Sequence, residues 1–125
     1  DIYGSHRCPI FHVSLEEAEP QKYVHNLWNA CKIVFFNEMR LVCDKLGIDA
    51  DIVFPIVMKS AEAQWNSQYG IRDFGPFGGS CLPKDTVAFY DWAKRQLNLN
   101  LTLLREVIKV NNQVKERRNG NGNGH

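Results

Sequence analysis

The stretch 14–46, SLEEAEPQKYVHNLWNACKIVFFNEMRLVCDKL, decides the fold of this chain. Ser14 and Glu17 have the spacing of a capping box, which favours a helix start at this point. Pro20 offers an alternative start, with the glutamate before it as the cap and the proline at the first helical position. Gly47 suits the end of the helix. From the later start the helix is roughly 40 Å long, at about 1.5 Å per residue.

The apolar residues of this helix cover more than one of its sides. One set recurs at helical spacing: Tyr23, Leu27, Ala30, Cys31, Val34, Phe35, Val42 and Leu46. A second set lies off that stripe: Val24, Trp28, Ile33, Phe36 and Met39. A helix that is apolar on several sides is buried on several sides. Because a chain of 125 residues has limited material to surround so long a helix, we expect a homodimer that packs through it.

The rest of the chain predicts shorter helices. Asp49 is a suitable cap for a helix over 50–59, and periodic apolar residues predict two more over 83–97 and 101–117. Residues 60–80 are rich in glycine and predict a loop. Since no segment predicts a strand, the expected fold class is all-α, a long central helix with shorter helices packed on it.

The composition is that of one ordinary domain. The chain is 44% apolar and 23% charged, which argues against global disorder. A net charge of +1 offers no basic face for nucleic acid. The apolar runs are shorter than the about 18 residues that a membrane span needs. We therefore predict neither a nucleic-acid partner nor a membrane partner.

The four cysteines are widely spaced and none forms a CxxC pair. This usage predicts reduced thiols in a cytoplasmic protein, with a disulfide as the less favoured alternative. Cys31 and Cys43 lie in apolar helical stretches, and we expect them to be small buried side chains. His6, Cys8 and His12 match no common zinc spacing, so we predict no metal site.

The segment 75–85, GPFGGSCLPKD, carries the strongest chemical signal. Gly78 and Gly79 precede Cys81, and a helix is expected to begin directly after it. Glycines let backbone N–H groups approach a ligand, and a helix N-terminus favours a nucleophilic thiolate. The positive charge of Lys84 also favours the thiolate form of Cys81. The alternative is structural: a glycine loop followed by a helix with a first-turn proline, and a cysteine with no role.

Other polar and aromatic residues have two interpretations each. Lys22 and Asn26 share one face of the long helix. In one interpretation they bind a sugar hydroxyl or an oxyanion, and in the other they form a solvated edge of the helix. Asp85 positions a water or holds the neighbouring lysine. The 60–80 loop contains three large side chains, Trp65, Tyr69 and Arg72. In one interpretation they line a pocket, and in the other they anchor the loop to the core. Asn111 and Asn112 interrupt the apolar face of the last helix, and since buried amides need partners, we expect one to point at a ligand or at the cysteine loop.

These motifs resemble the central domain of the UDP-glucose/GDP-mannose dehydrogenase family. The family's cysteine motif reads roughly G-F-G-G-S-C-x-P-K-D, and residues 77–85 match it closely. Upstream, the family's A-E-x-x-K-Y-x-x-N and a following N-E pair match Ala18–Asn26 and Asn37–Glu38. The last helix up to Asn111 is similar to the family's link into its third domain. The resemblance covers roughly residues 15–115.

The chain also departs from the family pattern. Pro76 stands where the family usually has glycine, and Arg72 is a candidate for an arginine that reaches a sugar across the family's dimer. The G-x-G-x-x-G loop of the family's Rossmann domain is absent. We therefore expect 15–118 to be the central helical domain of a three-domain enzyme. Residues 1–14 are expected to be a linker or the end of the Rossmann domain, and 119–125 a disordered Asn/Gly tail.

The resemblance implies an NAD-dependent nucleotide-sugar 6-dehydrogenase, which oxidises a sugar C6 alcohol to a carboxylate, as in UDP-glucose to UDP-glucuronate. NAD is expected to bind mainly to a domain outside this chain, with Lys84 on the cofactor side. Cys81 would form a thiohemiacetal and then a thioester, Lys22 and Asn26 would stabilise the oxyanion, and Asp85 would position the water. The implied substrate contacts are Phe77, Gly78, Gly79, Ser80 and Arg72.

The isolated chain is expected to be inactive, because it lacks most of the cofactor and nucleotide sites. Two alternatives stay open. One is a stand-alone helical dimerisation module without catalysis. The other is a different thiol enzyme that transfers acyl groups, for which His25 is the plausible general base. An activated Cys81 should alkylate faster than Cys31 or Cys43, which separates the catalytic interpretations from the first alternative.

Overall fold

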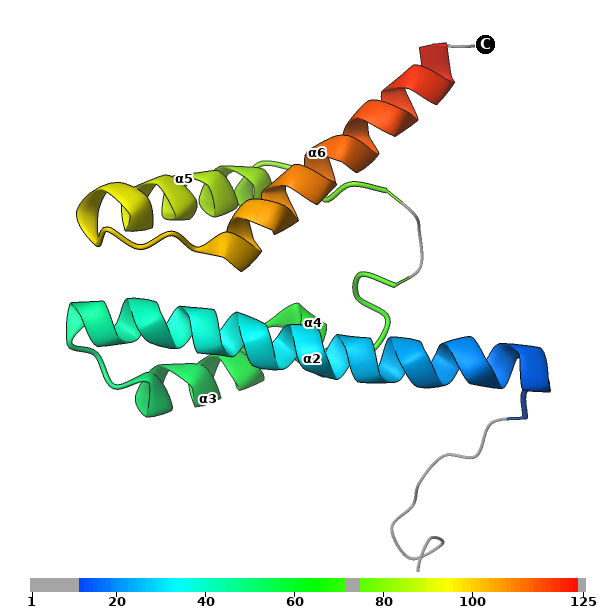
Figure 1. The fold of residues 1–125 in the computed structure, drawn as a ribbon, viewed down its shortest axis with the longest axis horizontal. Coiled ribbons are helices and arrows are strands. Elements are labelled where there is room, and N and C mark those ends of the chain that lie inside the picture. Colours follow the sequence, from blue (N-terminus) through cyan, green and yellow to red (C-terminus); the bar gives the residue numbers. More distant parts are fainter. Residues whose placement is uncertain (1–11, 72–74, 124–125) are drawn as a thin grey trace, which may run out of the picture. The chain divides into compact units, whose positions relative to one another are not determined.

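The computed structural model describes residues 12–71 and 75–123. Every regular element in these residues is a helix, in the order α2, α3, α4, α5 and α6 (Figure 1). The predicted all-α class is therefore confirmed. The chain divides into two units, the first ending at Ile33 and the second beginning at Val34. None of the helices in the described residues is long and apolar enough to span a membrane.

The long helix α2 extends over Leu15–Leu46. At its start the Glu17 N–H donates to Ser14 Oγ at 3.1 Å, and the Ser14 N–H donates to Glu17 Oε1 at 3.3 Å. These two bonds form the predicted capping box. Pro20 lies inside the helix, so of the two predicted starts the structure has the earlier one.

The junction between α2 and the next helix also follows the sequence signals. Gly47 has a φ of +68°, and the Ile48 N–H reaches the Cys43 carbonyl at 2.9 Å. Glycine adopts this left-handed conformation without steric cost, which is why it ends the helix here. Asp49 Oδ1 then accepts a hydrogen bond from the Asp51 N–H at 2.9 Å and caps the following helix, as predicted.

In the first unit, the large apolar side chains of α2 are exposed. Leu15 is 91% exposed, and the exposed fractions of the others lie between 59% and 64%: Tyr23, Val24, Leu27, Trp28 and Ile33. Cys31 is exposed as well, whereas Cys43 in the second unit is buried. The expectation that both thiols are buried is wrong for Cys31. Helical spacing shows which side chains share a face, but it does not show whether the chain covers that face.

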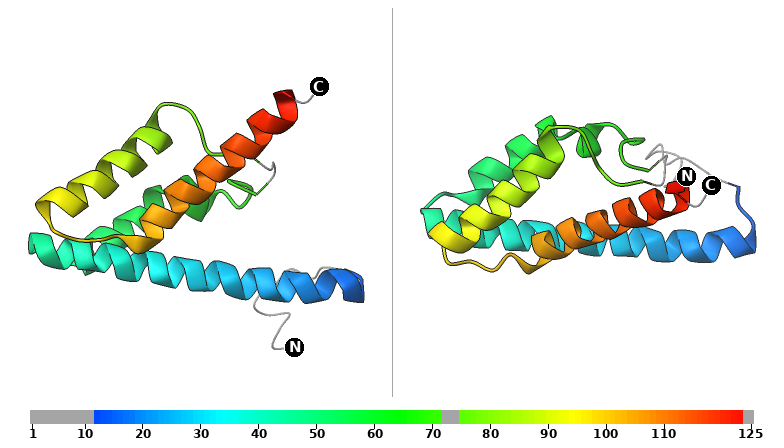
Figure 2. Two further views of the ribbon diagram at one scale, coloured as in Figure 1. Left: turned by 45° about the horizontal axis from the view of Figure 1, so that its top comes forward. Right: turned by 90° about the horizontal axis from the view of Figure 1, so that it is seen from above.

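The core lies in the second unit, between the end of α2, α5 (Cys81–Gln96) and the start of α6 (Thr102–Asn123). Val42, Ala93 and Leu101 are at most 5% exposed. Partly buried side chains surround them: Met39, Phe89, Tyr90, Leu97, Leu99 and Leu104. Figure 2 shows α5 and α6 as neighbouring helices in both views. Helices α5 and α6 thus pack on the second part of α2, and the prediction that shorter helices pack on the long one is confirmed.

A second contact joins α2 to α3, which extends over Ala50–Ser60. The Phe36 and Phe54 rings meet edge to face, with centroids 4.8 Å apart. Arg40 lies over the Phe54 ring at 5.2 Å and pairs with Asp51 at 3.2 Å. The three contacts fix α3 alongside α2.

Three element boundaries differ from the predicted ones. The segment predicted as loop, 60–80, contains a short helix, α4 (Glu62–Trp65), because one turn leaves no periodic pattern to detect. Helix α5 begins at Cys81 rather than after it. Helix α6 continues to Asn123, through residues predicted as an irregular tail, since extending an existing helix needs no new nucleus. The predicted domain limits stay a prediction.

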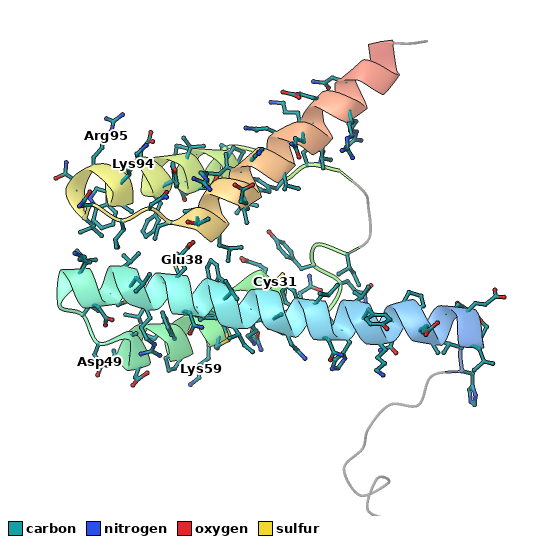
Figure 3. The ribbon with its side chains drawn as sticks, viewed as in Figure 1. Cys31, Glu38, Asp49, Lys59, Lys94 and Arg95 are labelled. Carbon is teal, nitrogen blue, oxygen red and sulfur yellow. The ribbon has the colours of Figure 1, made fainter. Side chains whose placement is uncertain are left out.

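Glu38 of α2 caps the start of α6. Its Oε1 accepts from the Leu103 N–H at 2.9 Å, and its Oε2 accepts from the Leu104 N–H at 3.0 Å. Figure 3 labels Glu38 on the side of α2 that meets α6. The first N–H groups of a helix have no partner within the helix, and a carboxylate there also complements the helix dipole. One side chain thereby ties two helices together.

Candidate functional site

Cys81 is the first residue of α5 and follows a glycine loop directly. Gly79 has a φ of +83°, a conformation that favours glycine over other residues. Ser80 occupies the cap position, and its hydroxyl lies 3.7 Å from the Cys81 sulfur. The thiol is free and exposed. The loop therefore presents an accessible nucleophile at a helix start.

The start of α5 is a positive helix end. Its first turn contains no acidic residue, and Lys84 is exposed there. Helix N-termini offer unpaired N–H groups and a partial positive charge, which stabilise an oxyanion formed beside Cys81. Asp85 is exposed and lies four residues after Cys81, so the two share one face of α5. Cys81, Lys84 and Asp85 thus combine a nucleophile, a cation and a carboxylate with the N–H donors of the helix end.

The cysteine loop is attached to α6 by Asn111. The Phe77 N–H donates to Asn111 Oδ1 at 2.8 Å, and Asn111 Nδ2 donates to the Phe77 carbonyl at 3.2 Å. The prediction that one of the two asparagines points at this loop is confirmed for Asn111. Its neighbour Asn112 is exposed.

An open hollow of about 880 Å³ lies beside this loop in the second unit. Phe77 and Gly78, two of the predicted substrate contacts, line it, but Gly79 and Ser80 do not. The other lining residues come from the preceding loop, α5 and α6: Asn66, Gln68, Tyr69, Gly70, Gly75, Pro76, Leu82 and Asn111. Asn66 and Gln68 were not predicted, because their only signal in the sequence is a polar side chain in a loop that contains glycine.

The loop aromatics separate into the two predicted roles. Tyr69 lines the hollow. Trp65 Nε1 donates to the Ser60 carbonyl at 3.3 Å, so Trp65 is attached to the end of α3 instead. Arg72 lies outside the described residues.

Lys22 and Asn26 lie on α2 in the first unit, and both are exposed. Their spacing places them on one face of the helix, as predicted. His25 is also exposed on this part of α2. The roles given to these side chains by resemblance stay predictions.

The described residues contain no group of three His, Cys, Asp or Glu side chains that could hold a metal ion. Of the residues weighed for a metal, His6 and Cys8 lie outside this part of the chain, and His12 is exposed. Cys31, Cys43 and Cys81 are free thiols. The reduced state of the cysteines stays a prediction.

Comparison with known proteins gives a family and several curated relatives. Residues 16–113 match the central domain of the UDP-glucose/GDP-mannose dehydrogenase family. A GDP-mannose 6-dehydrogenase of Pseudomonas aeruginosa is 33% identical over 117 residues, which are 93% of this chain and 26% of that protein. A UDP-glucose 6-dehydrogenase of Bacillus subtilis is 35% identical over 112 residues, 90% of this chain and 24% of that protein.

No solved structure gives a significant match. The chain spans about a quarter of the length of the curated relatives that it matches. The family match covers most of the chain, including α2, the cysteine loop and Asn111. The chain therefore belongs to the UDP-glucose/GDP-mannose dehydrogenase family and corresponds to its central domain.

Proposed function

We propose that the protein containing this chain oxidises the C6 alcohol of a nucleotide sugar to a carboxylate, with Cys81 as the nucleophile. The observation that carries this proposal is the exposed free thiol of Cys81 at the start of α5, directly after a glycine loop, inside the family's central domain. The named relatives act on GDP-mannose and UDP-glucose. Both substrates carry a primary alcohol at C6, so the proposed reaction applies to either.

The proposed cofactor is NAD. Two nicotinamide cofactors, bound one after the other, would each accept one of the two hydrides that C6 loses. Lys84 is exposed in the first turn of α5, and its ammonium fits the phosphate oxygens of a dinucleotide. We infer that most other cofactor contacts come from outside the described residues.

Cys81 acts on the aldehyde formed by the first oxidation. Its sulfur bonds to C6, and the thiol proton passes to the aldehyde oxygen, which gives a thiohemiacetal. After C6 loses the second hydride and the hydroxyl loses its proton, Cys81 holds the sugar as a thioester. Water then adds to C6, the C–S bond breaks, the sulfur recovers a proton and the carboxylate is released. The covalent bond retains the intermediate between the two oxidations.

Other side chains are assigned supporting roles. Lys22 and Asn26 stabilise the oxygen that becomes negative at C6, since an ammonium and an amide N–H both donate hydrogen bonds. Asp85, on the same face of α5 as Cys81, orients the hydrolytic water. The backbone of Phe77, Gly78, Gly79 and Ser80, together with Arg72, contacts the sugar.

We also infer that the enzyme is a homodimer that packs through the first part of α2. Six large apolar side chains there are more than half exposed. Contiguous apolar surface on a helix marks an interaction site more often than it marks solvent contact. A second copy of the same helix offers a matching apolar face in a symmetric pair.

The test uses the full-length protein with NAD and either UDP-glucose or GDP-mannose. We expect two reduced nicotinamides per uronate formed. The C81A variant should lose at least about a thousandfold in kcat, as is typical when a nucleophile is removed. C31A is the matched control, because Cys31 is also an exposed free thiol, and it should keep the wild-type rate.

Two results would contradict the proposal. Wild-type turnover by C81A would remove the nucleophile from the mechanism. Failure to reduce NAD with either sugar, in a protein that folds, would favour the helical dimerisation module or an acyl-transferring thiol enzyme. An H25A variant with full activity would remove the general base from the latter.

A further inference from the structure

The Asn111 side chain pairs with both backbone polar groups of one loop residue. It accepts from the Phe77 N–H at 2.8 Å and donates to the Phe77 carbonyl at 3.2 Å, across a sequence separation of 34 residues. Both bonds are partly buried. Such a pair fixes the position and the orientation of the Phe77 peptide groups together, which a single hydrogen bond does not do.

The residues between Phe77 and Cys81 offer little packing of their own. A Cβ added at Gly78 or Gly79 would meet no atom within 4 Å, so neighbouring side chains do not enclose this backbone. Glycines also have the widest choice of backbone conformations. The path to Cys81 is therefore set at its two ends, by Asn111 at Phe77 and by α5 at Cys81.

A second contact from α6 lies at the beginning of the loop. The Arg118 Nη1 is 2.7 Å from the point that a Cβ on Gly75 would occupy, so the guanidinium lies close against the Gly75 backbone. Arg118 follows Asn111 by seven residues, or two helical turns, which places both on one side of α6. The same face of α6 thus meets the loop at Gly75 and at Phe77.

We propose that Asn111 is a positioning residue for Cys81: by holding Phe77 it fixes the glycine loop and thereby the direction in which the thiol is presented. The inference rests on the proposed role of Cys81 as the nucleophile. Helix α6 then contributes to the position of Cys81, although Asn111 lies 30 positions after Cys81 in the sequence. Asn111 acts through the loop and does not react.

The chemistry of an amide makes the inference testable. Asn offers one acceptor oxygen and a donor NH₂, whereas an ionised Asp has acceptors only. The N111D substitution keeps the bond from the Phe77 N–H, but its carboxylate repels the Phe77 carbonyl. When the new carboxyl is protonated, it again has both a donor and an acceptor. In N111D, a change of pH therefore makes or breaks the hydrogen bond to the Phe77 carbonyl, while the shape of the side chain stays the same.

The experiment follows backbone amide NMR signals of the ¹⁵N-labelled chain during an acid titration. In N111D, the Phe77 amide should titrate with the new carboxyl at or above the ordinary pKa of about 4, because only the protonated form makes both hydrogen bonds to Phe77. The amides of Gly79, Ser80 and Cys81 should move with the same midpoint. Each change is measured as a difference from wild type.

N112D is the matched control, because it adds the same charge one position further on, at an exposed residue. Its Cys81 amide should follow the wild-type titration. The inference is overturned if N111D and N112D give the same Cys81 titration, or if only Phe77 responds in N111D.

A second measurement keeps the two proposals distinguishable. N111L removes both hydrogen bonds at similar volume, and alkylation of Cys81 should slow about threefold relative to Cys31, the scale of a helix-end effect. An unchanged ratio in a folded N111L chain overturns the positioning role alone. If wild-type Cys81 is no faster than Cys31, the nucleophile proposal fails, while the NMR coupling between residues 77 and 81 still decides whether Asn111 holds the loop.

Discussion

The two parts of α2 differ in how much of their apolar surface is covered. Before Val34, the large apolar side chains are all at least 59% exposed. From Val34 on, the most exposed ones reach 52%, and Val42, at 5%, packs with Ala93 and Leu101. The residue types are similar, so the difference lies in what covers them. In the second part, α5 and α6 of the same chain cover one face. The first part of α2 is as rich in apolar side chains as the second, and we infer that a second copy of the chain covers them.

The largest expected effect comes from a charge in the exposed part. L27D places a carboxylate in the stripe of Tyr23, Leu27 and Val34, and burying it against a second copy is costly. We expect the dimer dissociation constant to rise at least about a hundredfold, as for a central interface residue. Light scattering across a concentration series measures it.

N29D is the control for this change, because helical geometry places Asn29 on the side away from that stripe. It should leave the dissociation constant within about threefold of wild type. A monomeric wild-type chain, or an L27D chain as dimeric as N29D, would contradict the dimer inferred from the first part of α2.

A smaller effect is expected where the second part of α2 meets α6. E38A removes the acceptor for two α6 N–H groups and should lower the free energy of unfolding by about 2 kcal/mol. E38Q keeps one acceptor and should lose about half as much. E106A is the control, because Glu106 pairs with Arg105 at the surface, and it should cost less than about 0.5 kcal/mol. Urea unfolding of the chain measures all three, and equal losses for E38A and E106A would contradict the capping role.

The smallest effect is expected in the cysteine loop. Gly79 has a φ of +83°, so G79A should destabilise the loop by about 1 kcal/mol. G78A is its matched partner, because Gly78 has no such φ and an added Cβ there meets nothing within 4 Å. It should be nearly neutral in the same unfolding experiment. A G78A loss as large as that of G79A would show that the backbone conformation is not the cause.

Signals within a few residues predicted the ends of the helices well. Ser14 with Glu17, Gly47 and Asp49 each act on a neighbour in sequence, so the spacing alone identifies their bonds. The exceptions are α4, where four residues form a helix too short to leave a period, the start of α5 at Cys81 and the end of α6 at Asn123. The exposure of Cys31 was also mispredicted, because burial depends on what packs against a face and not on the face itself.

The site was predicted in its local parts and missed in its distant ones. Cys81, its glycines and Lys84 form one continuous segment, and their placement at a helix start follows from the sequence. The cap that Glu38 provides spans 65 residues, and no local pattern indicates it. Asn111 is an intermediate case: an amide on an apolar face predicts a buried partner, but only the fold identifies Phe77 as that partner.

The most direct test of the account compares the two exposed thiols of one chain. Cys31 lies in the middle of α2 and Cys81 at the start of α5, so only Cys81 has free helix-end N–H groups beside it. The chain is kept at a concentration at which light scattering shows a monomer, so that no second copy covers Cys31. Alkylation with iodoacetamide near neutral pH, resolved by peptide mass spectrometry, then gives both rate constants in the same sample. We predict that Cys81 reacts about three- to tenfold faster. A Cys81 rate equal to or below that of Cys31 would contradict its role as the nucleophile.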